Sequence, residues 1–444
     1  MSEGVDTLGL DSPPRLAVDG LLDDPGTRII VCCGAGGVGK TTTAAALGVR
    51  AAERGRKAVV LTIDPARRLA QSMGIDSLDN TPREVGGVGT DGGGLHAMML
   101  DMKRTFDEIV EAHADAERAK AILANPFYQS LSAGFAGTQE YMAMEKLGQL
   151  RARDDWDLII VDTPPSRSAL DFLDAPKRLG SFLDGKFIRV LMAPAKVGGR
   201  AGMKFLNVGM SIMTGTLSKL MGASLLKDVQ TFVAAMDTMF GGFRTRADAT
   251  FRLLQAPGTA FLVVAAPEPD ALREAAYFVE RLAAEKMPLA GLVLNRVHGS
   301  GADQLSAERA LAAAENLEDG GIVDQESGKA GLRDSADDDG SPAGSSAGSS
   351  DKTTDDTTHD TIDDTIDSAP DDTPVVDEIT AGLLRLHAER MQVIAREQRT
   401  RDRFTSLHPE VAVAEVAALP GDVHDLAGLR AIGERLAAGV PAGA

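Results

Sequence analysis

Short apolar runs alternate with helical patterns along most of the chain. The runs are rich in β-branched residues and span 27–33, 56–64, 95–100, 157–162, 259–266, 288–295 and 410–416. They are almost continuously apolar, as expected of strands that are covered on both faces of a sheet. Between two of them, the segment 270–285 repeats apolar residues at helical spacing. This alternation predicts an α/β fold with a doubly wound, mostly parallel sheet and crossover helices.

Two longer helical patterns interrupt the alternation. The first covers about 104–151 and opens with Thr105 and Glu108, which have the spacing of a capping box. The second covers about 168–255. We expect them to form a helical subdomain inserted into the sheet domain.

Acidic residues are concentrated in one segment. Residues 318–372 carry 17 acidic and 3 basic side chains and no aromatic residue, so burial of apolar surface cannot offset the entropy lost on folding. We expect a disordered acidic insertion here, either a solvated loop or an interaction segment. With a flexible tail over residues 1–26, this leaves a domain made of residues 27–317 and 373–440.

Composition excludes several classes of protein. The 444 residues carry a net charge of -19, which argues against nucleic-acid binding because such binding depends on Lys and Arg. No apolar run is long enough to cross a membrane, and the N-terminus lacks a signal-peptide pattern. We therefore expect a cytoplasmic protein without an integral membrane segment. Its two cysteines, Cys32 and Cys33, are adjacent, which excludes a disulfide framework.

The most informative motif follows the first predicted strand. The sequence from Gly34 to Thr41 reads GAGGVGKT and fits G-x-x-x-x-G-K-[ST] between a strand and a helix. Backbone N–H groups of such a loop surround phosphates, the lysine neutralises phosphate oxygens and the threonine hydroxyl binds Mg²⁺. We predict that ATP is bound by Gly34, Ala35, Gly36, Gly37, Val38, Gly39, Lys40, Thr41 and Thr42, with Lys40 also catalytic.

Two aspartates end predicted strands. Asp64 closes the run 56–64 and Asp162 closes the run 157–162. In doubly wound sheets ligands lie beyond the carboxyl ends of the strands, so both carboxylates are expected near the phosphates. One can hold the metal and the other can orient a water for hydrolysis.

At these residues the chain resembles the family of the arsenical-pump ATPase and the ATPase that delivers tail-anchored membrane proteins, within the deviant-Walker group. The resemblance covers roughly residues 27–315 and 376–436. It is carried by GGVGKTT (36–42), TIDPARRL from Thr62, GTQEYMAMEKL (137–147) and VDTPPSRSALDFLDAP (161–176). It implies that Asp64 orients the attacking water, that Thr41 and Asp162 hold Mg²⁺, and that Asn295 and Pro420 contact adenine.

Three departures from the family pattern affect the expected mechanism. Ala35 stands where the family has a lysine that reaches the partner subunit's phosphates, so a heterodimer with a lysine-bearing paralogue is expected to be more productive than a homodimer. The segment 161–176 resembles the family's second switch segment, and in it Arg167 and Ser168 stand where the family has a glycine and a histidine. Cys32 and Cys33 lie in a strand, which gives arsenite no thiolate site near the helical subdomain.

The expected function is therefore hydrolysis of ATP by a dimer. Its opening and closing would handle a hydrophobic protein client or energise a membrane partner, and peripheral attachment at the membrane is compatible with this function. Methionines concentrated in 192–239 fit either a client groove or a helical core. Two alternatives stay open: a spatial-positioning ATPase of the ParA or MinD kind, and a weakly catalytic nucleotide-binding subunit of a heterodimer.

Overall fold

The computed structural model describes residues 14–63, 67–75, 77–89, 92–132, 138–164, 242, 245–320 and 373–438. The chain divides into two compact units, one formed by residues 1–301 with 393–444 and the other by residues 302–392. Asp64, the second switch segment beyond Pro164 and the methionine-rich region 192–239 lie outside the described residues.

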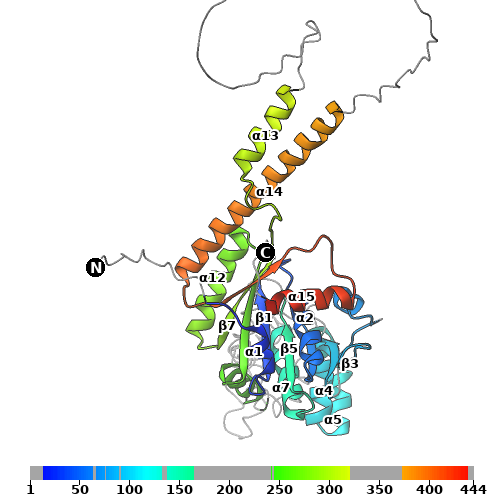
Figure 1. Ribbon diagram of the computed structural model, residues 1–444. Coiled ribbons are helices and arrows are strands. Elements are labelled where there is room, and N and C mark those ends of the chain that lie inside the picture. Colours follow the sequence, from blue (N-terminus) through cyan, green and yellow to red (C-terminus); the bar gives the residue numbers. More distant parts are fainter. Residues whose placement is uncertain are drawn as a thin grey trace, which may run out of the picture. The chain divides into compact units, whose positions relative to one another are not determined.

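A single sheet forms the centre of the larger unit (Figure 1). Its strand order is β3-β4-β2-β5-β1-β6-β7-β8, and neighbouring strands are parallel except for the antiparallel pair of β3 and β4. The strands are β1 (Ile29–Gly34), β2 (Lys57–Thr62), β3 (Arg83–Glu84), β4 (Gly94–Met99), β5 (Leu158–Asp162), β6 (Thr259–Ala265), β7 (Leu289–Val297) and β8 (Val413–Ala417). Every predicted run thus contains a strand, and the predicted fold class is confirmed. The strand β3 was not predicted because its two side chains are exposed.

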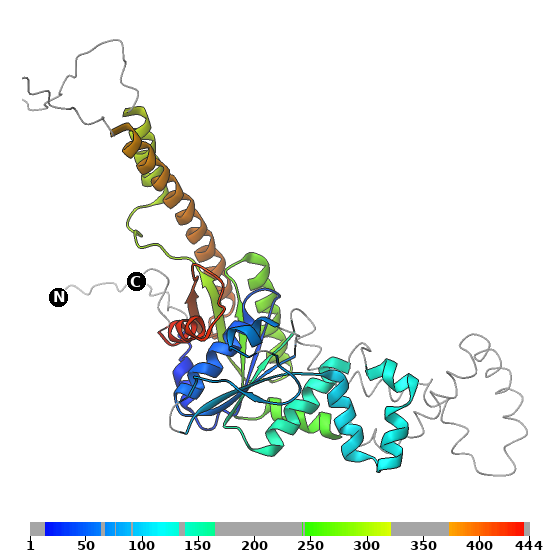
Figure 2. The ribbon, with the colours of Figure 1, turned by 90° about the vertical axis from the view of Figure 1, so that its right-hand side faces the viewer.

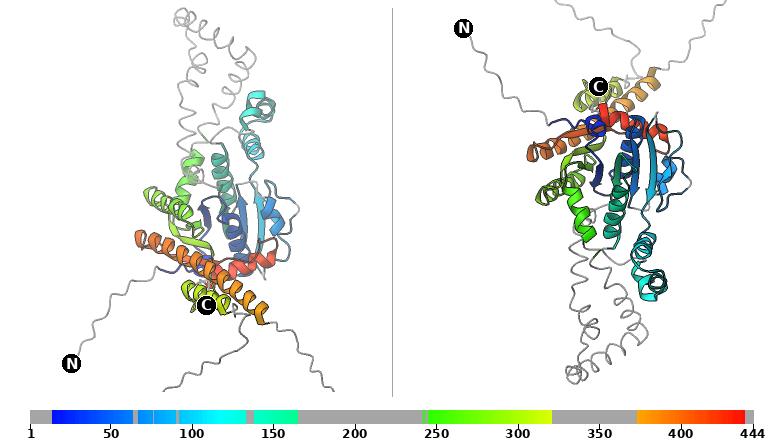
Figure 3. Two further views of the ribbon diagram at one scale, coloured as in Figure 1. Left: turned by 90° about the horizontal axis from the view of Figure 1, so that it is seen from above. Right: turned by 90° about the horizontal axis from the view of Figure 1, so that it is seen from below.

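Helices cover both faces of the sheet (Figures 1 and 3). Alternate residues of β1 divide between two cores, with Ile30 in one and Ile29 in the other, as the pleat of a strand requires. The first face packs against α1 (Val18–Asp23), α2 (Lys40–Glu53), α3 (Arg67–Ser72) and α15 (Leu426–Ala438). The second packs against α4 (Met102–His113), α5 (Ala116–Leu123), α6 (Pro126–Ser132), α7 (Thr138–Arg153) and α12 (Pro269–Ala284).

The flexible N-terminal tail expected over residues 1–26 extends too far, because residues 14–26 are folded. Residues 14–26 contain α1, whose Leu22 is fully buried, and Arg15 forms a parallel β-bridge with Val413. Arg56, which directly precedes β2, holds this segment in place, because its guanidinium donates to the carbonyls of Leu22 and Thr27 at 2.9 and 2.7 Å. Only residues 1–13 of the expected tail lie outside the described residues.

The helical region expected over about 104–151 consists of α4, α5, α6 and α7. Its first helix begins at Met102, and the cap is Asp101, whose side chain accepts a hydrogen bond from the backbone N–H of Arg104 at 2.9 Å. The capping box expected at Thr105 is therefore wrong: the Thr105 hydroxyl is buried and donates to Asn80 Oδ1 at 3.1 Å. Most of the second expected region, 168–255, lies outside the described residues.

The described part of the smaller unit consists of α13 (Ala307–Gly320) and the first part of α14 (Thr373–Leu407) (Figure 2). Small side chains on both helices are buried: Ala310, Ala314, Ala381 and Ala388. An ion pair joins Arg385 to Glu318, and a hydrogen-bond contact joins His387 Nε2 to the carbonyl of Leu305 at 2.8 Å. Residues 318–320 of the predicted acidic insertion are thus helical, and residues 321–372 lie outside the described residues.

Candidate functional site

The glycine-rich loop connects the central strand β1 to α2. Gly34, the last residue of β1, has a φ of +146, and a Cβ there would lie 2.1 Å from the Val264 carbonyl oxygen of β6. Gly39 caps α2 in the left-handed conformation, and its carbonyl accepts from Thr43 N at 2.9 Å. Both positions therefore require glycine, and they fix the two ends of the predicted phosphate loop.

Lys40 begins α2 and is almost completely buried, with 6% of its surface exposed. Its Nζ donates a hydrogen bond to the carbonyl of Ala35 at 2.7 Å. The ammonium group thus lies across the loop that the sequence predicts to surround phosphates. Ala35 and Val38 are buried, whereas Gly36 and Gly37 are exposed, so the loop presents its glycines to incoming ligand.

Asp162 meets the loop at the carboxyl end of β5. The register of the sheet aligns Asp162 with Cys32 of β1 and with Thr62 of β2. Its Oδ2 accepts hydrogen bonds from Thr41 Oγ1 at 2.7 Å and from Thr62 Oγ1 at 2.9 Å. The structure therefore brings together the two residues that the sequence predicts to hold the metal. Thr62 is a third member of this group that sequence reasoning did not assign.

Asn295 lies on the other side of the loop, near the end of β7. Its Nδ2 donates to the carbonyl of Val38 at 2.8 Å, and its Oδ1 accepts from the backbone N–H of Arg296 at 3.0 Å. A Cβ on Gly39 would lie 2.2 Å from this Nδ2. Asn295 thus supports the phosphate loop directly. Pro420 is exposed in the connection from β8 to α15, and the adenine contacts proposed for both residues remain predictions.

Ile63, the residue before Asp64, is held by hydrogen bonds to both its N–H and its carbonyl group. Ile63 N donates to the Asp162 carbonyl at 3.0 Å, and the Ile63 carbonyl accepts from Gln139 Nε2 at 3.0 Å. Gln139 lies in the first turn of α7, within the segment GTQEYMAMEKL. No sequence pattern gives this glutamine a role, because its partner is a backbone carbonyl that is 76 residues away.

The two cysteines are buried in β1 behind the loop. Burial raises the pKa of the Cys33 thiol to about 12, and it raises the pKa of Cys32 well above its usual value. Cys33 Sγ lies 3.6 Å from the carbonyl of Leu262, as a weak donor. Both thiols are therefore protonated at neutral pH, and neither is suited to bind a metalloid or a metal, which requires the thiolate.

The sheet topology and the loop define a P-loop ATPase. A family model described as Anion-transporting ATPase matches residues 27–318. The chain therefore belongs to the anion-transporting ATPase family, which confirms both the resemblance and the expected enzyme class, an ATPase. Nucleotide is accordingly the cofactor class that the family implies.

Curated relatives agree with this family. The chain is 30% identical over 167 residues to ATPase GET3 of Malassezia globosa, which covers 38% of this chain and 47% of that protein. It is 25% identical over 308 residues to ATPase GET3 of Podospora anserina, covering 68% of this chain and 83% of that protein. A Putative arsenical pump-driving ATPase of Halobacterium salinarum is 29% identical over 182 residues, with coverage of 39% and 27%. The matched segment thus spans about half the length of the Malassezia relative and less of the Halobacterium one.

The described helices include none that is long and apolar enough to span a membrane. The C-terminal helix α15 uses its apolar face internally, because Leu429, Ile432 and Leu436 are buried against the sheet core. Its Arg430 pairs with Glu53 of α2 at 2.6 Å. The apolar face of α15 is therefore not free to lie on a membrane surface.

Proposed function

We propose that the loop from Gly34 to Thr42 binds Mg-ATP and that this chain hydrolyses it with the help of Asp64. The observation that best supports this site is the hydrogen bond of 2.7 Å between the Thr41 hydroxyl and the Asp162 carboxylate at the base of the loop. In P-loop ATPases, a threonine of the loop and an aspartate at the end of another strand hold the Mg²⁺ that accompanies the nucleotide.

The residues present fit Mg²⁺. Its preferred ligands are oxygen atoms and retained waters, and the site offers one hydroxyl and one carboxylate beside the phosphate loop. Thr41 would bind the ion directly, and Asp162 would hold it through its water shell. When bound, Mg²⁺ would compensate negative charge on the phosphate oxygens of ATP. Thr62 keeps the Asp162 carboxylate oriented toward Thr41.

The chain's own groups account for the remaining requirements of phosphoryl transfer. The loop N–H groups and the Lys40 ammonium compensate charge on the β- and γ-phosphates. Asp64, next to the doubly fixed Ile63, accepts a proton from the attacking water and orients it. Phosphoryl transfer needs little further covalent help from a protein, because positioning and charge compensation supply most of the rate.

We further propose that ATP binding and hydrolysis close and open a dimer that handles a hydrophobic protein client or energises a membrane partner. Membership in the family and the names of its relatives, ATPase GET3 and arsenical pump-driving ATPase, support this class of work. The buried thiols with raised pKa favour a protein client over a metalloid. Binding of an apolar helical peptide of transmembrane length, compared between Mg-ATP and Mg-ADP, tests the proposal; equal affinity in the two states contradicts it.

Two substitutions test the catalytic assignment. Lys40→Ala should abolish binding of Mg-ATP measured by calorimetry, because it removes the buried cation of the loop. Lys57→Ala is the matched control, since Lys57 is an exposed lysine at the start of β2. Asp64→Asn should bind Mg-ATP normally and lose hydrolysis, because an amide cannot accept the proton of water. If Lys40→Ala binds Mg-ATP as tightly as the wild type, the loop is not the nucleotide site. If Asp64→Asn hydrolyses ATP at the wild-type rate, only the catalytic role of Asp64 is wrong.

A regulatory, weakly catalytic subunit is a second candidate, and Ala35 favours it. The structure has a buried alanine at this loop position, where the family pattern places a lysine that acts across a dimer. Turnover of the isolated chain, compared with turnover in a mixture with a lysine-bearing paralogue, distinguishes the two candidates. A subunit of this kind gains activity only in the mixture.

A further inference from the structure

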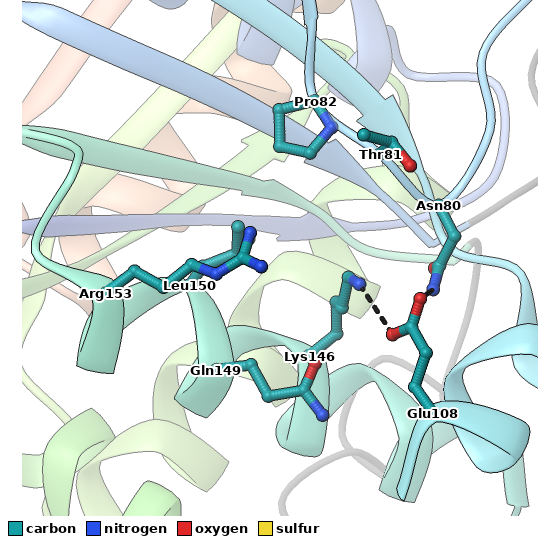
Figure 4. A pocket seen from close by; sticks show the side chains of 8 residues that line it. All are labelled: Asn80, Thr81, Pro82, Glu108, Lys146, Gln149, Leu150 and Arg153. Atoms are coloured by element: carbon teal, nitrogen blue, oxygen red, sulfur yellow. Dashed lines mark hydrogen bonds and ion pairs between the residues drawn. The ribbon is translucent and has the colours of Figure 1, made fainter. Parts of the chain in front are cut away.

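A small polar pocket lies away from the phosphate loop, between α4, α7 and the segment that precedes β3 (Figure 4). Its volume is about 120 Å³. Its polar lining comes from Asn80 and Thr81, from Glu108 of α4, and from Lys146, Gln149 and Arg153 of α7. The pocket is far too small for a nucleotide, since a cavity of roughly 150 Å³ holds one benzene molecule.

Three of these side chains are hydrogen-bond donors on one face of α7. Residues Lys146, Gln149 and Arg153 are spaced by three and by four, so they follow each other along the same side of the helix. Figure 4 shows the Lys146 ammonium and the Arg153 guanidinium bordering the hollow, with Thr81 on the opposite side. The helix therefore presents a row of donors to the pocket.

The only carboxylate of the lining is already engaged. Glu108 Oε2 accepts from Lys146 Nζ at 3.1 Å, and Glu108 Oε1 accepts from Asn80 Nδ2 at 3.2 Å. Asn80 is fixed in turn, because its Oδ1 accepts from Asp101 N and from Thr105 Oγ1, both at 3.1 Å. The acidic wall of the pocket is thus rigid and has no oxygen turned freely toward a ligand.

The side chains that line the pocket carry more positive than negative charge. Lys146 is 7% exposed and pairs with Glu108 at 3.1 Å, and Glu108 also pairs with Arg104 of α4 at 3.5 Å. Within the described residues, no hydrogen bond or ion pair involves the Arg153 guanidinium or the Gln149 amide. Two cations therefore face one carboxylate, and the unused donors outnumber the unused acceptors. A cationic ligand would meet repulsion here, and a neutral apolar ligand would leave the donors unsatisfied.

We propose that this pocket binds a small oxyanion, such as a sulfate, phosphate or carboxylate group. The planar guanidinium of Arg153 matches the two oxygens of such a group, and Lys146 adds a second positive charge at the base of the pocket. Gln149 and Thr81 supply further neutral donors. The bound ion would connect α7 to the segment 80–82 at the edge of the sheet. The proposal is independent of the assignments made for the phosphate loop.

Titration of the full chain with sulfate tests this site. The protein is first saturated with Mg²⁺ and a non-hydrolysable ATP analogue, so that the phosphate loop cannot take up the probe, and ionic strength is held constant with chloride. Calorimetry is expected to show saturable binding with a Kd of about 1 mM or tighter, with a saturating rise in Tm alongside it. A second titration with acetate shows whether a planar carboxylate is accepted as well as a tetrahedral anion.

Matched variants locate the binding. Arg153→Gln should weaken binding at least tenfold, and the fold should survive because Arg153 is exposed. Arg151→Gln removes the same charge two residues earlier on α7, where Arg151 pairs with Asp154 outside the pocket, and should leave the affinity unchanged. Lys146→Gln provides a second variant, with circular dichroism to check folding. The proposal is overturned if neither anion binds, or if Arg151→Gln and Arg153→Gln weaken binding equally.

Discussion

Gly39 and Asn295 approach each other closely at the phosphate loop, since a Cβ on Gly39 would lie 2.2 Å from Asn295 Nδ2. Gly39→Ala should therefore break the hydrogen bond from Asn295 to Val38 and also strain a left-handed backbone position by roughly 1–2 kcal/mol. We expect a lower Tm and a weaker affinity for Mg-ATP, measured by thermal denaturation and calorimetry.

A double-mutant cycle separates the two effects. Asn295→Ala removes the clash but not the backbone strain, so the variant with both substitutions should lose less stability than the two single losses combined. Strictly additive losses would show that Asn295 and Gly39 do not interact, and that the hydrogen bond from Asn295 does not shape the loop.

Site residues that a local sequence pattern marks were predictable, whereas the side-chain contacts that support the loop were not. The loop from Gly34 to Thr41 is a local pattern, and Asp162 ends an apolar run. The position of Asn295 against Val38 depends instead on the pairing of β1, β6 and β7, across 257 residues of sequence. Thr62 likewise reaches Asp162 only because β2 and β5 pair in that register.

At the level of elements, α7 connects its neighbouring helices with the nucleotide site. Two partly buried ion pairs hold its centre: Glu145 pairs with Arg246 at 2.8 Å, and Lys146 pairs with Glu108 of α4 at 3.1 Å. Its first turn contacts the end of β2 through the hydrogen bond from Gln139 to Ile63. Since Glu108 and Arg246 fix the centre of α7, movement of these partners is expected to displace the Ile63 peptide.

Substitution of Gln139 tests this connection. Gln139→Ala should lower kcat about tenfold, equivalent to roughly 1.4 kcal/mol of activation free energy, because the peptide leading to Asp64 loses its support. KM for ATP should stay the same, since the phosphate loop is untouched. Steady-state kinetics of Gln139→Glu, which keeps the length but not the donor, should resemble those of Gln139→Ala. Wild-type kinetics in Gln139→Glu would show that the hydrogen bond has no part in turnover.

The sequence predicted the buried strands well and the short elements poorly. Fully buried strands such as β6 consist almost entirely of apolar residues, as expected of a parallel strand covered on both faces. The helix α1 has only six residues, among acidic neighbours, so its buried Val18 and Leu22 gave no periodic signal. The start of α4 was misplaced because Asp101 competes with Thr105 as a cap, and the buried contact of Thr105 with Asn80 decides between them.

For the whole molecule, the pairing of α13 and α14 should not depend on the segment that joins them. Buried alanines and the pair of Arg385 with Glu318 hold the two helices together. Replacing residues 321–372 by a short glycine-serine linker should therefore preserve the ATPase rate and leave Tm the same or slightly higher, because a shorter loop lowers the closure entropy by roughly 0.6 kcal/mol per halving of length. Differential scanning calorimetry checks this, and a large fall in Tm would show that the segment packs against the rest.

Assembly and catalysis are linked through Ala35. If this chain works as a dimer, Ala35→Lys should raise hydrolysis by the isolated protein, since a cation that reaches the partner's γ-phosphate can be worth roughly 10³-fold or more in rate. Ala35→Met controls for side-chain length without charge, and light scattering establishes the oligomeric state of each variant. Equal turnover of the wild type, Ala35→Lys and Ala35→Met would leave no place for a charge acting across the dimer.

The burial of the two cysteines makes their rate of chemical modification a measure of how often β1 opens. Cys32 and Cys33 are the only thiols in the sequence, and both lie in the central strand with pKa values raised by burial. A thiol reagent can therefore modify the folded chain only when β1 separates from its neighbours, so the labelling rate counts those openings. The same strand leads into the phosphate loop. Nucleotide bound at this loop is therefore expected to slow the separation of β1 and with it the labelling rate of the two thiols.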